Sequence, residues 1–162
     1  MQNDDAGLRP GEYILTDESE FLWRQINPAF IHDGKVSKQA FTPTPKDTGE
    51  LSTVRSSKVT AEQSHSHHTA ILGLASVGVY SVQVSDVAEV QLRAVDDSAV
   101  DDGDERPPGH AFVDFKTVTS SKARQRIGSS LRDKAEARGW QYQAETSTVD
   151  EPQADDSAPP EE

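Results

Sequence analysis

The sequence predicts a small α+β domain, in which a short mixed or antiparallel sheet carries two main helices on one face. Residues 60–92 hold the longest apolar stretch, and its pattern passes from the helical period to a β-branched run and back to a short helix. A second strand pattern at 110–115 and an amphipathic helix ending near Gly139 follow it. Only 33% of the residues are apolar and 6% aromatic, which predicts a modest core.

The length of 162 residues suits one domain, which we expect to span residues 13–143. Polar, acidic composition predicts disorder at residues 1–12 and in a tail at 144–162, and an acidic loop at 95–109. Residues 1–20, 95–109 and 144–162 carry net charges of −5, −5 and −7, so the remaining segments sum to +5 although the whole chain is at −12. Acidic tails of this kind favour solubility, and the charge does not by itself predict a nucleic-acid mimic.

The elements before residue 60 are short. Asp17-Glu-Ser-Glu20 could open a short helix that runs through Trp23, or residues 21–26 could form a strand that buries Phe21 and Trp23 on one face. Asn27-Pro28 ends either one. Residues 30–36 predict a hairpin, because Asp33-Gly34 supplies the positive φ of a tight turn. Residues 42–50 have loop composition, and residues 51–55 predict a strand.

The central unit begins with Thr60-Ala-Glu-Gln63, the pattern of a capping box, and Gly73 marks the end of its helix. Residues 77–84 predict a central strand, because apolar side chains alternate onto both of its faces. Ser85 and Asp86 resemble the cap of a short helix that carries Val87, Val90 and Leu92.

A long helix follows the second strand. Ser120 or Ser121 would cap it, and Gly139 would end it. Its apolar stripe comprises Ala123, Ile127, Leu131 and Ala135. We expect Trp140 and Tyr142 to fold back onto the core.

The absence of cysteine favours a reducing cytosol. The first residues lack a secretory pattern, and no apolar run approaches the roughly 20 residues of a membrane helix. We therefore expect a cytoplasmic protein that has no membrane contact. No cofactor motif is recognisable, so no cofactor is expected.

Histidines are concentrated in Ser64-His65-Ser66-His67-His68. On a helix, His65 and His68 lie one turn apart and are candidate metal ligands, but a site would need a further ligand such as His32, His110 or Asp114. The alternative is that His65 and His68 fill a half-buried stripe while His67 faces water. Without a complete ligand motif, we predict no metal.

The last helix is basic: residues 116–138 contain seven bases and two acids. Such a run is typical of phosphate binding, and the candidate contacts are Lys122, Arg124, Arg126 and Arg132. A solvated face, or one covered by the acidic tail, explains the same charges. Nucleic-acid binding through residues 116–138 therefore stays one of two interpretations.

Arg24, His32 and His110 are the candidate catalytic residues, because they supply acid–base and anion-holding groups. Their spacing specifies no reaction. Neither a P-loop nor a G-x-S-x-G or dinucleotide-binding pattern is present, so whether the protein is an enzyme is left open.

Several short motifs occur together between residues 22 and 115. They are Arg24-Gln-Ile-Asn-Pro28, Asp33-Gly34, Ser37-Lys-Gln-Ala-Phe41, Thr44-Pro-Lys-Asp47, Leu51-Ser52 and His110-Ala111, and a Gly-Trp follows near the end of the last helix. This pattern resembles a family of small uncharacterised bacterial proteins. The resemblance implies a bacterial, cytoplasmic origin and brings no activity with it. The long acidic loop and both tails depart from the pattern.

We expect a non-enzymatic protein that binds another macromolecule, such as an adaptor, antitoxin or immunity-type protein. Small size, segregated charge and the lack of a complete catalytic motif favour a protein–protein interaction. The first alternative is a small hydrolase or transferase that uses the His and Arg groups. The second is nucleic-acid binding through the basic C-terminal helix.

Overall fold

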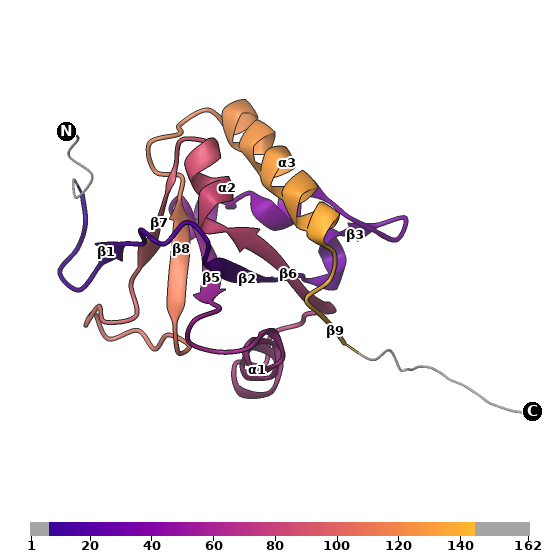
Figure 1. Cartoon of the computed structure of the whole chain (residues 1–162), viewed down its shortest axis with the longest axis horizontal. Coiled ribbons are helices and arrows are strands. Elements are labelled where there is room, and N and C mark those ends of the chain that lie inside the picture. Colours follow the sequence, from indigo (N-terminus) through magenta and orange to yellow (C-terminus); the bar gives the residue numbers. More distant parts are fainter. Residues whose placement is uncertain (1–6, 145–162) are drawn as a thin grey trace, which may run out of the picture.

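A computed structural model describes residues 7–144, which form one antiparallel seven-stranded sheet flanked by helices (Figure 1). The strand order is β1-β7-β8-β5-β2-β6-β9, and β3 and β4 form a separate hairpin. The strands are β1 Tyr13–Ile14, β2 Phe21–Gln25, β3 Ile31–His32, β4 Lys35–Val36, β5 Glu50–Arg55, β6 Gly78–Gln83, β7 Arg93–Asp96, β8 His110–Asp114 and β9 Tyr142–Gln143. The helices are η1 Pro28–Phe30, η2 Lys38–Phe41, η3 Pro45–Asp47, α1 Ala61–Ser66, η4 His67–Ile71, α2 Val84–Glu89 and α3 Ser121–Arg138.

The predicted α+β class is confirmed, and of the two sheet types left open the antiparallel one is present. The placement of both main helices on one face was wrong. Helices α2 and α3 cover one face of the sheet, whereas α1 lies across the other (Figure 1). The reason is visible in β6, whose first five residues are all buried, so that both of its faces need cover.

The core lies between the sheet and α3. Leu22 pairs with Val82 across β2 and β6, and Leu51 pairs with Val113 across β5 and β8. All four side chains are buried with Leu131 of α3 in one cluster. The predicted apolar stripe of the last helix is thus the surface that closes the core.

Residues 21–25 form a strand, which decides between the two predicted alternatives. The strand alternative expected Phe21 and Trp23 to be buried on one face; as alternate residues they do share a face, but both are only half-buried. Leu22 is the side chain that this strand buries in the core. The predicted hairpin at residues 30–36 is confirmed as β3 and β4. The predicted loop at 42–50 contains the 3-10 turn η3.

The central unit follows the predicted order of helix, strand and short helix. Thr60 and Gln63 form the capping box of α1, as predicted. The cap of α2 differs: Gln83 is the N-cap, and Asp86 occupies the third helical position, from which its carboxylate accepts the Gln83 N–H. Helix α2 ends at Glu89, so Val87 lies on it as predicted, whereas Val90 is its C-cap and Leu92 lies beyond it.

The chain end returns to the sheet as predicted. Ser120 caps α3, and Gly139, with φ of 84°, ends it. Trp140 then stacks on Tyr80 with ring centroids 4.2 Å apart, and β9 pairs with the start of β6.

The predicted disorder of 1–12 and 144–162 falls outside the described residues, except at residues 7–12 and 144. Strand β7 occupies the first two positions of the predicted acidic loop, so the loop proper begins at Asp97. Among residues 7–144, none of the helices has the length and apolar character needed to cross a membrane.

Candidate functional site

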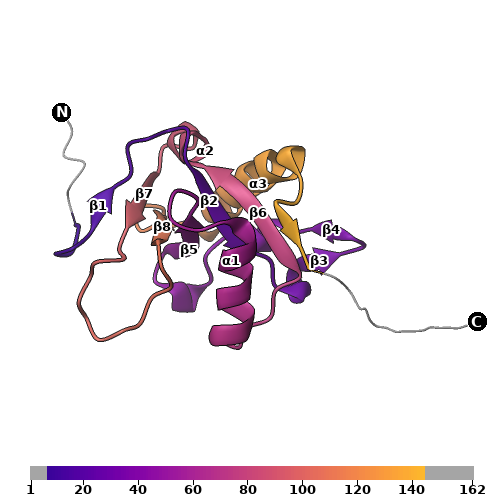
Figure 2. The ribbon, with the colours of Figure 1, turned by 60° about the horizontal axis from the view of Figure 1, so that its bottom comes forward.

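A groove on the α1 side of the sheet collects three of the titratable groups that the sequence pointed to, Arg24, His68 and His110. It consists of two adjoining pockets of about 230 and 150 Å³, which share Val54 and Pro107 in their walls. We call it the histidine groove, and its defining residues are Trp23, Val54, His67, His68, Pro107 and His110. Figures 1 and 2 both place its two banks, α1 and the loop joining β7 to β8, on the same side of the sheet.

One side of the histidine groove is formed by helix α1 and the π-helical turn η4 that follows it. Helix α1 continues at His67 as the π-helical turn η4, in which the Leu72 N–H donates to the His67 carbonyl. Wider turns of this kind are frequent at functional sites. His67 lines the smaller pocket and His68 lines the larger one. Burial, with a smaller contribution from the Arg24 charge, lowers the pKa of His68 below its ordinary value, so its ring is neutral at pH 7.

The opposite bank holds His110 in a fixed orientation. Its Nδ1 lies 2.6 Å from Oδ1 of Asp97, a carboxylate with only 2% of its side chain exposed. Arg106 Nε donates to the other Asp97 oxygen at 3.1 Å. A carboxylate on Nδ1 fixes the ring and leaves Nε2 available for another partner.

The floor of the groove comes from β2 and β5. Trp23 Nε1 donates to the Val59 carbonyl at 2.9 Å, which holds the indole ring beneath α1. Strands β2 and β5 pair at only two positions and then separate. Arg24 spans the gap by donating from Nε to the Ala40 carbonyl at 2.6 Å and from Nη1 to the Ser52 carbonyl at 2.9 Å. Burial lowers the pKa of Arg24 to about 10, so it is charged at pH 7.

Three large apolar side chains stand exposed beside the larger pocket. Ile71, Leu72 and Leu74 are 69%, 42% and 51% exposed. They follow one another at the end of η4, and Leu72 and Leu74 line the pocket itself. Clustered exposed apolar groups next to a concave surface are typical of interaction sites.

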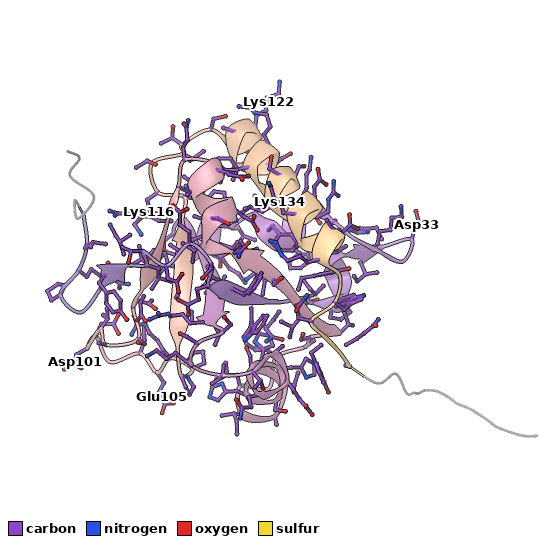
Figure 3. All side chains as sticks on the ribbon, in the orientation of Figure 1. Asp33, Asp101, Glu105, Lys116, Lys122 and Lys134 are labelled. Carbon is purple, nitrogen blue, oxygen red and sulfur yellow. The ribbon has the colours of Figure 1, made fainter. Side chains whose placement is uncertain are left out.

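The three candidate catalytic residues do not converge. Arg24 and His110 line the same pocket, whereas His32 is exposed on the β3–β4 hairpin. Figure 3 shows Asp33, the next residue, pointing outward at the tip of that hairpin. An acid–base pair built on His32 and His110 is therefore not assembled in this structure.

The two candidate metal ligands are used differently. His65 Nε2 lies 3.0 Å from the Ser76 carbonyl, and its ring packs on Tyr142. His68 lines the groove. Within residues 7–144, no three His, Asp or Glu side chains are grouped closely enough to hold a metal ion.

Most cations of the basic helix serve the fold. Arg124 donates to the Val118 and Phe115 carbonyls, Lys134 pairs with Glu89, and Arg138 pairs with Asp86. Arg132 lies near Asp133 and Glu136 on its own helix. Of the four predicted phosphate contacts, Lys122 and Arg126 are the exposed ones without an ion pair among the described residues. Figure 3 shows Lys122 projecting from the start of α3, on the face of the sheet opposite α1.

Sequence reasoning missed one residue that lines the groove, His67, and two that hold His110 in place, Asp97 and Arg106. His67 was expected to face water if His65 and His68 filled a half-buried stripe, but it lies one helical turn after the buried Ser64 and lines the smaller pocket. Asp97 and Arg106 were assigned to an acidic loop without a role. The sequence did hold one signal for their role, because Arg106 is the only base among six acids in residues 95–109. A single base in such a run can form ion pairs that hold the loop together, as Arg106 does with Asp97.

No protein-family model, curated protein or solved structure matches this chain.

Proposed function

We propose that this chain is a non-enzymatic protein-binding module whose recognition surface is the histidine groove with its apolar rim, Ile71, Leu72 and Leu74. The carrying observation is that rim, in which three large apolar side chains are exposed and two of them, Leu72 and Leu74, line the larger pocket. Protein interfaces concentrate their binding energy where apolar side chains enter small, preformed pockets. An adaptor, antitoxin or immunity-type role agrees with such a surface.

The dimensions of the groove favour a protein partner over a small-molecule substrate. Its pockets measure about 230 and 150 Å³. Pockets that enclose drug-sized ligands span roughly 300 to 1,000 Å³. Each pocket therefore fits one or two side chains of a partner. Internal hydrogen bonds hold Trp23 and Arg24 in the floor of the larger pocket.

Site-specific photocrosslinking tests this proposal in the native host. Benzoylphenylalanine at position 71 is expected to capture a partner, while the same group at position 122, on the opposite face of the sheet, captures none. The captured protein is then purified, and its affinity is measured by calorimetry for the wild type, Leu72→Asp/Leu74→Asp and Lys122→Asp. We expect the double variant to bind at least about tenfold more weakly, since it places charge in an apolar contact, and Lys122→Asp to bind normally. Equal binding by all three would reject the groove as the recognition surface.

A second function is favoured by one observation, the contact between His110 and the buried Asp97. A histidine oriented by a carboxylate is the arrangement of a general base, so a small hydrolase or transferase is the alternative. Turnover of an ester or phosphoester substrate by the wild type, absent in His110→Ala and reduced in Asp97→Asn, would favour this alternative. Nucleic-acid binding through α3 has less support, because Arg124 and Arg132 of its four predicted contacts have intramolecular partners.

A further inference from the structure

A second concave site lies between η2 and the start of α3, and we call it the α3 cavity. It has a volume of about 400 Å³, inside the roughly 300 to 1,000 Å³ of pockets that enclose small-molecule ligands. None of its lining residues belongs to either pocket of the histidine groove. Figure 3 labels Lys122, which marks the start of α3 on the face of the sheet opposite α1. The cavity therefore belongs to the α3 side of the molecule and the groove to the α1 side.

The two sides of the α3 cavity are held together by tight packing. Helix α3 approaches η2 so closely at Gly128 that a Cβ there would lie 2.0 Å from Thr42 Oγ1. Thr42 Oγ1 in turn donates to the Lys38 carbonyl at 2.8 Å. Pro43 and Pro45, which line the cavity, restrict the backbone between η2 and η3. The cavity is thus formed without a ligand, which lowers the entropic cost of binding one.

The charged residues that line the α3 cavity are both basic, although the chain as a whole is at −12. Lys38 is exposed and forms no ion pair within residues 7–144. Arg124 donates to two backbone carbonyls, at 2.6 and 3.3 Å, so its charge is not neutralised by a carboxylate in the described part of the chain. The acid nearest in the chain, Asp47, is outside the lining, and its carboxylate accepts the N–H and the hydroxyl of Thr44 at 2.7 Å. Positive charge without a counter-charge in a concave site favours an anionic ligand.

Hydroxyl and amide groups make up most of the remaining lining of the α3 cavity. The side chains of Thr119 and Gln39 are exposed and have no hydrogen-bond partner among the described residues. The Ser121 hydroxyl accepts from Gln125 Nε2 at 3.4 Å and keeps its own hydrogen for another acceptor. No aromatic ring lines the cavity, whereas sites that hold nucleobases commonly stack them on aromatic side chains. The lining therefore suits a ligand rich in hydroxyl groups better than a nucleotide.

We propose that the α3 cavity binds a small sugar phosphate, with the phosphate on the side of Lys38 and Arg124 and the sugar hydroxyls against Gln39, Thr119 and Ser121. A phosphate group carries a charge between −1 and −2 at neutral pH, which matches two cations better than a single carboxylate does. Lysine is a common phosphate ligand in proteins. This inference goes beyond the proposed function, because it assigns a ligand of another class to the other side of the molecule.

Titrations of the full chain, followed by NMR, test the ligand class. The probes are glucose-6-phosphate and ribose-5-phosphate, with glucose, inorganic phosphate and AMP as comparisons. We expect one of the two sugar phosphates to shift the amide signals of Thr119 and Ser121. It should bind at least about tenfold more tightly than glucose or inorganic phosphate, since each of these lacks one set of hydrogen bonds. Equal binding of inorganic phosphate, tighter binding of AMP, or no shift by either sugar phosphate at millimolar concentration would overturn the inference.

Two lysine variants test whether the ligand enters the cavity. Lys38→Met removes a charge from the lining and should weaken binding of the sugar phosphate about tenfold or more, as the loss of a charged hydrogen bond predicts. Lys122→Met is the matched control, because it removes the same charge from the start of α3 outside the lining, and it should bind within about twofold of the wild type. Both lysines are exposed, so both variants are expected to fold. Equal losses in the two variants would show a diffuse attraction to a basic surface and reject the cavity as the site, as would full binding by Lys38→Met.

The outcomes keep this inference apart from the proposed function. Leu72→Asp/Leu74→Asp changes the rim of the histidine groove and should bind the sugar phosphate like the wild type, while Lys38→Met should still be crosslinked to a partner from position 71. Loss of sugar-phosphate binding in the leucine variant would contradict the assignment to the α3 cavity. A single-stranded DNA that binds more tightly than the sugar phosphates, and loses affinity equally in Lys38→Met and Lys122→Met, would assign this surface to nucleic acid and reject the sugar phosphate.

Discussion

At the scale of single residues, Arg24 supplies hydrogen bonds to the backbone at a place where the pairing of two strands stops. Pairing between β2 and β5 stops after Trp23 and Val54, and beyond that point the two carbonyls of Ala40 and Ser52 are bridged by the guanidinium. A charged donor at this position satisfies the Ser52 carbonyl of β5, where pairing with β2 has stopped, and the Ala40 carbonyl of η2. The residue that sequence analysis marked as a candidate catalytic group thus has a structural task in the floor of the groove.

Replacing Arg24 by methionine is therefore expected to lower the free energy of unfolding by about 2–3 kcal/mol, because two carbonyls lose a charged donor. Urea unfolding followed by tryptophan fluorescence measures this change. Arg126→Met, on an exposed part of α3, is the matched control and should alter stability by less than about 0.5 kcal/mol. Full stability of Arg24→Met combined with a loss of partner binding would instead assign the guanidinium to ligand recognition.

At the scale of elements, local signals made the prediction possible. The capping box at Thr60, the Asp33-Gly34 turn and the Gly139 stop each depend on neighbouring residues, and each lies where it was expected. Strands β1 and β9, of two residues each, lack such signals, because their existence depends on pairing with β7 and β6. Long-range pairing of this kind is not encoded in a window of sequence.

The candidate site was predictable to the same degree. His110 and Arg24 were chosen by residue type, and both line the groove. Asp97 reaches His110 only because β7 and β8 pair antiparallel, which places the start of the connecting loop beside the start of β8. His67 keeps its α-helical bond to Gln63 and lies one turn after the buried Ser64, so the helical period itself places it on that face. The miss at Asp97 arises from tertiary pairing, whereas the miss at His67 arises from assigning the half-buried stripe to His65 and His68.

Helix α3 and turn η2 meet at a glycine, and this contact gives an element-scale prediction. A Cβ at Gly128 would lie 2.0 Å from Thr42 Oγ1 and 3.1 Å from the Lys38 carbonyl. Alanine favours a helix interior by about 1 kcal/mol over glycine, but the clash forces the helix away from η2. We expect Gly128→Ala to destabilise the fold by about 1–3 kcal/mol.

Thermal unfolding of three proteins tests this prediction. Ser130→Ala, exposed two positions later in the same helix, should equal or slightly exceed the wild type in stability. Thr42→Ala combined with Gly128→Ala should recover part of the loss, because the closest atom is removed while the carbonyl remains. A Gly128→Ala protein more stable than the wild type would show that η2 yields at no cost.

At the scale of the whole molecule, buried carboxylates are held by arginines that come from distant strands. Arg55 of β5 donates to Glu20 before β2 and to Asp96 of β7, at 2.9 and 2.7 Å. Arg93 of β7 pairs with Asp114 of β8 at 3.0 Å. The acidic segments of the chain are therefore partly built into the fold, and the stability of the sheet depends on their ionisation.

Acid should unfold this protein through Glu20 and Asp96. Burial alone would raise the pKa of each, but hydrogen bonds from Arg55 and neighbouring serines outweigh it and lower both below their ordinary values. A carboxyl with a lowered folded pKa stabilises the fold above its unfolded pKa, and this contribution is lost as pH falls through the folded pKa. We expect an unfolding temperature that is steady from pH 8 to about 5 and falls below about pH 4.5, near the ordinary pKa of these groups.

Arg55→Met should lower the free energy of unfolding by about 3–5 kcal/mol at pH 7, because it leaves two buried charges without their partner. Its further loss of stability in acid should be smaller than that of the wild type, because its carboxylates keep only their serine and tyrosine partners. Arg55→Lys retains a charge and tests the same site if the methionine variant does not fold. Lys134→Met, which breaks the exposed pair with Glu89, should follow the wild-type curve. An Arg55→Met curve parallel to that of the wild type would place the acid sensitivity in other carboxylates of the chain.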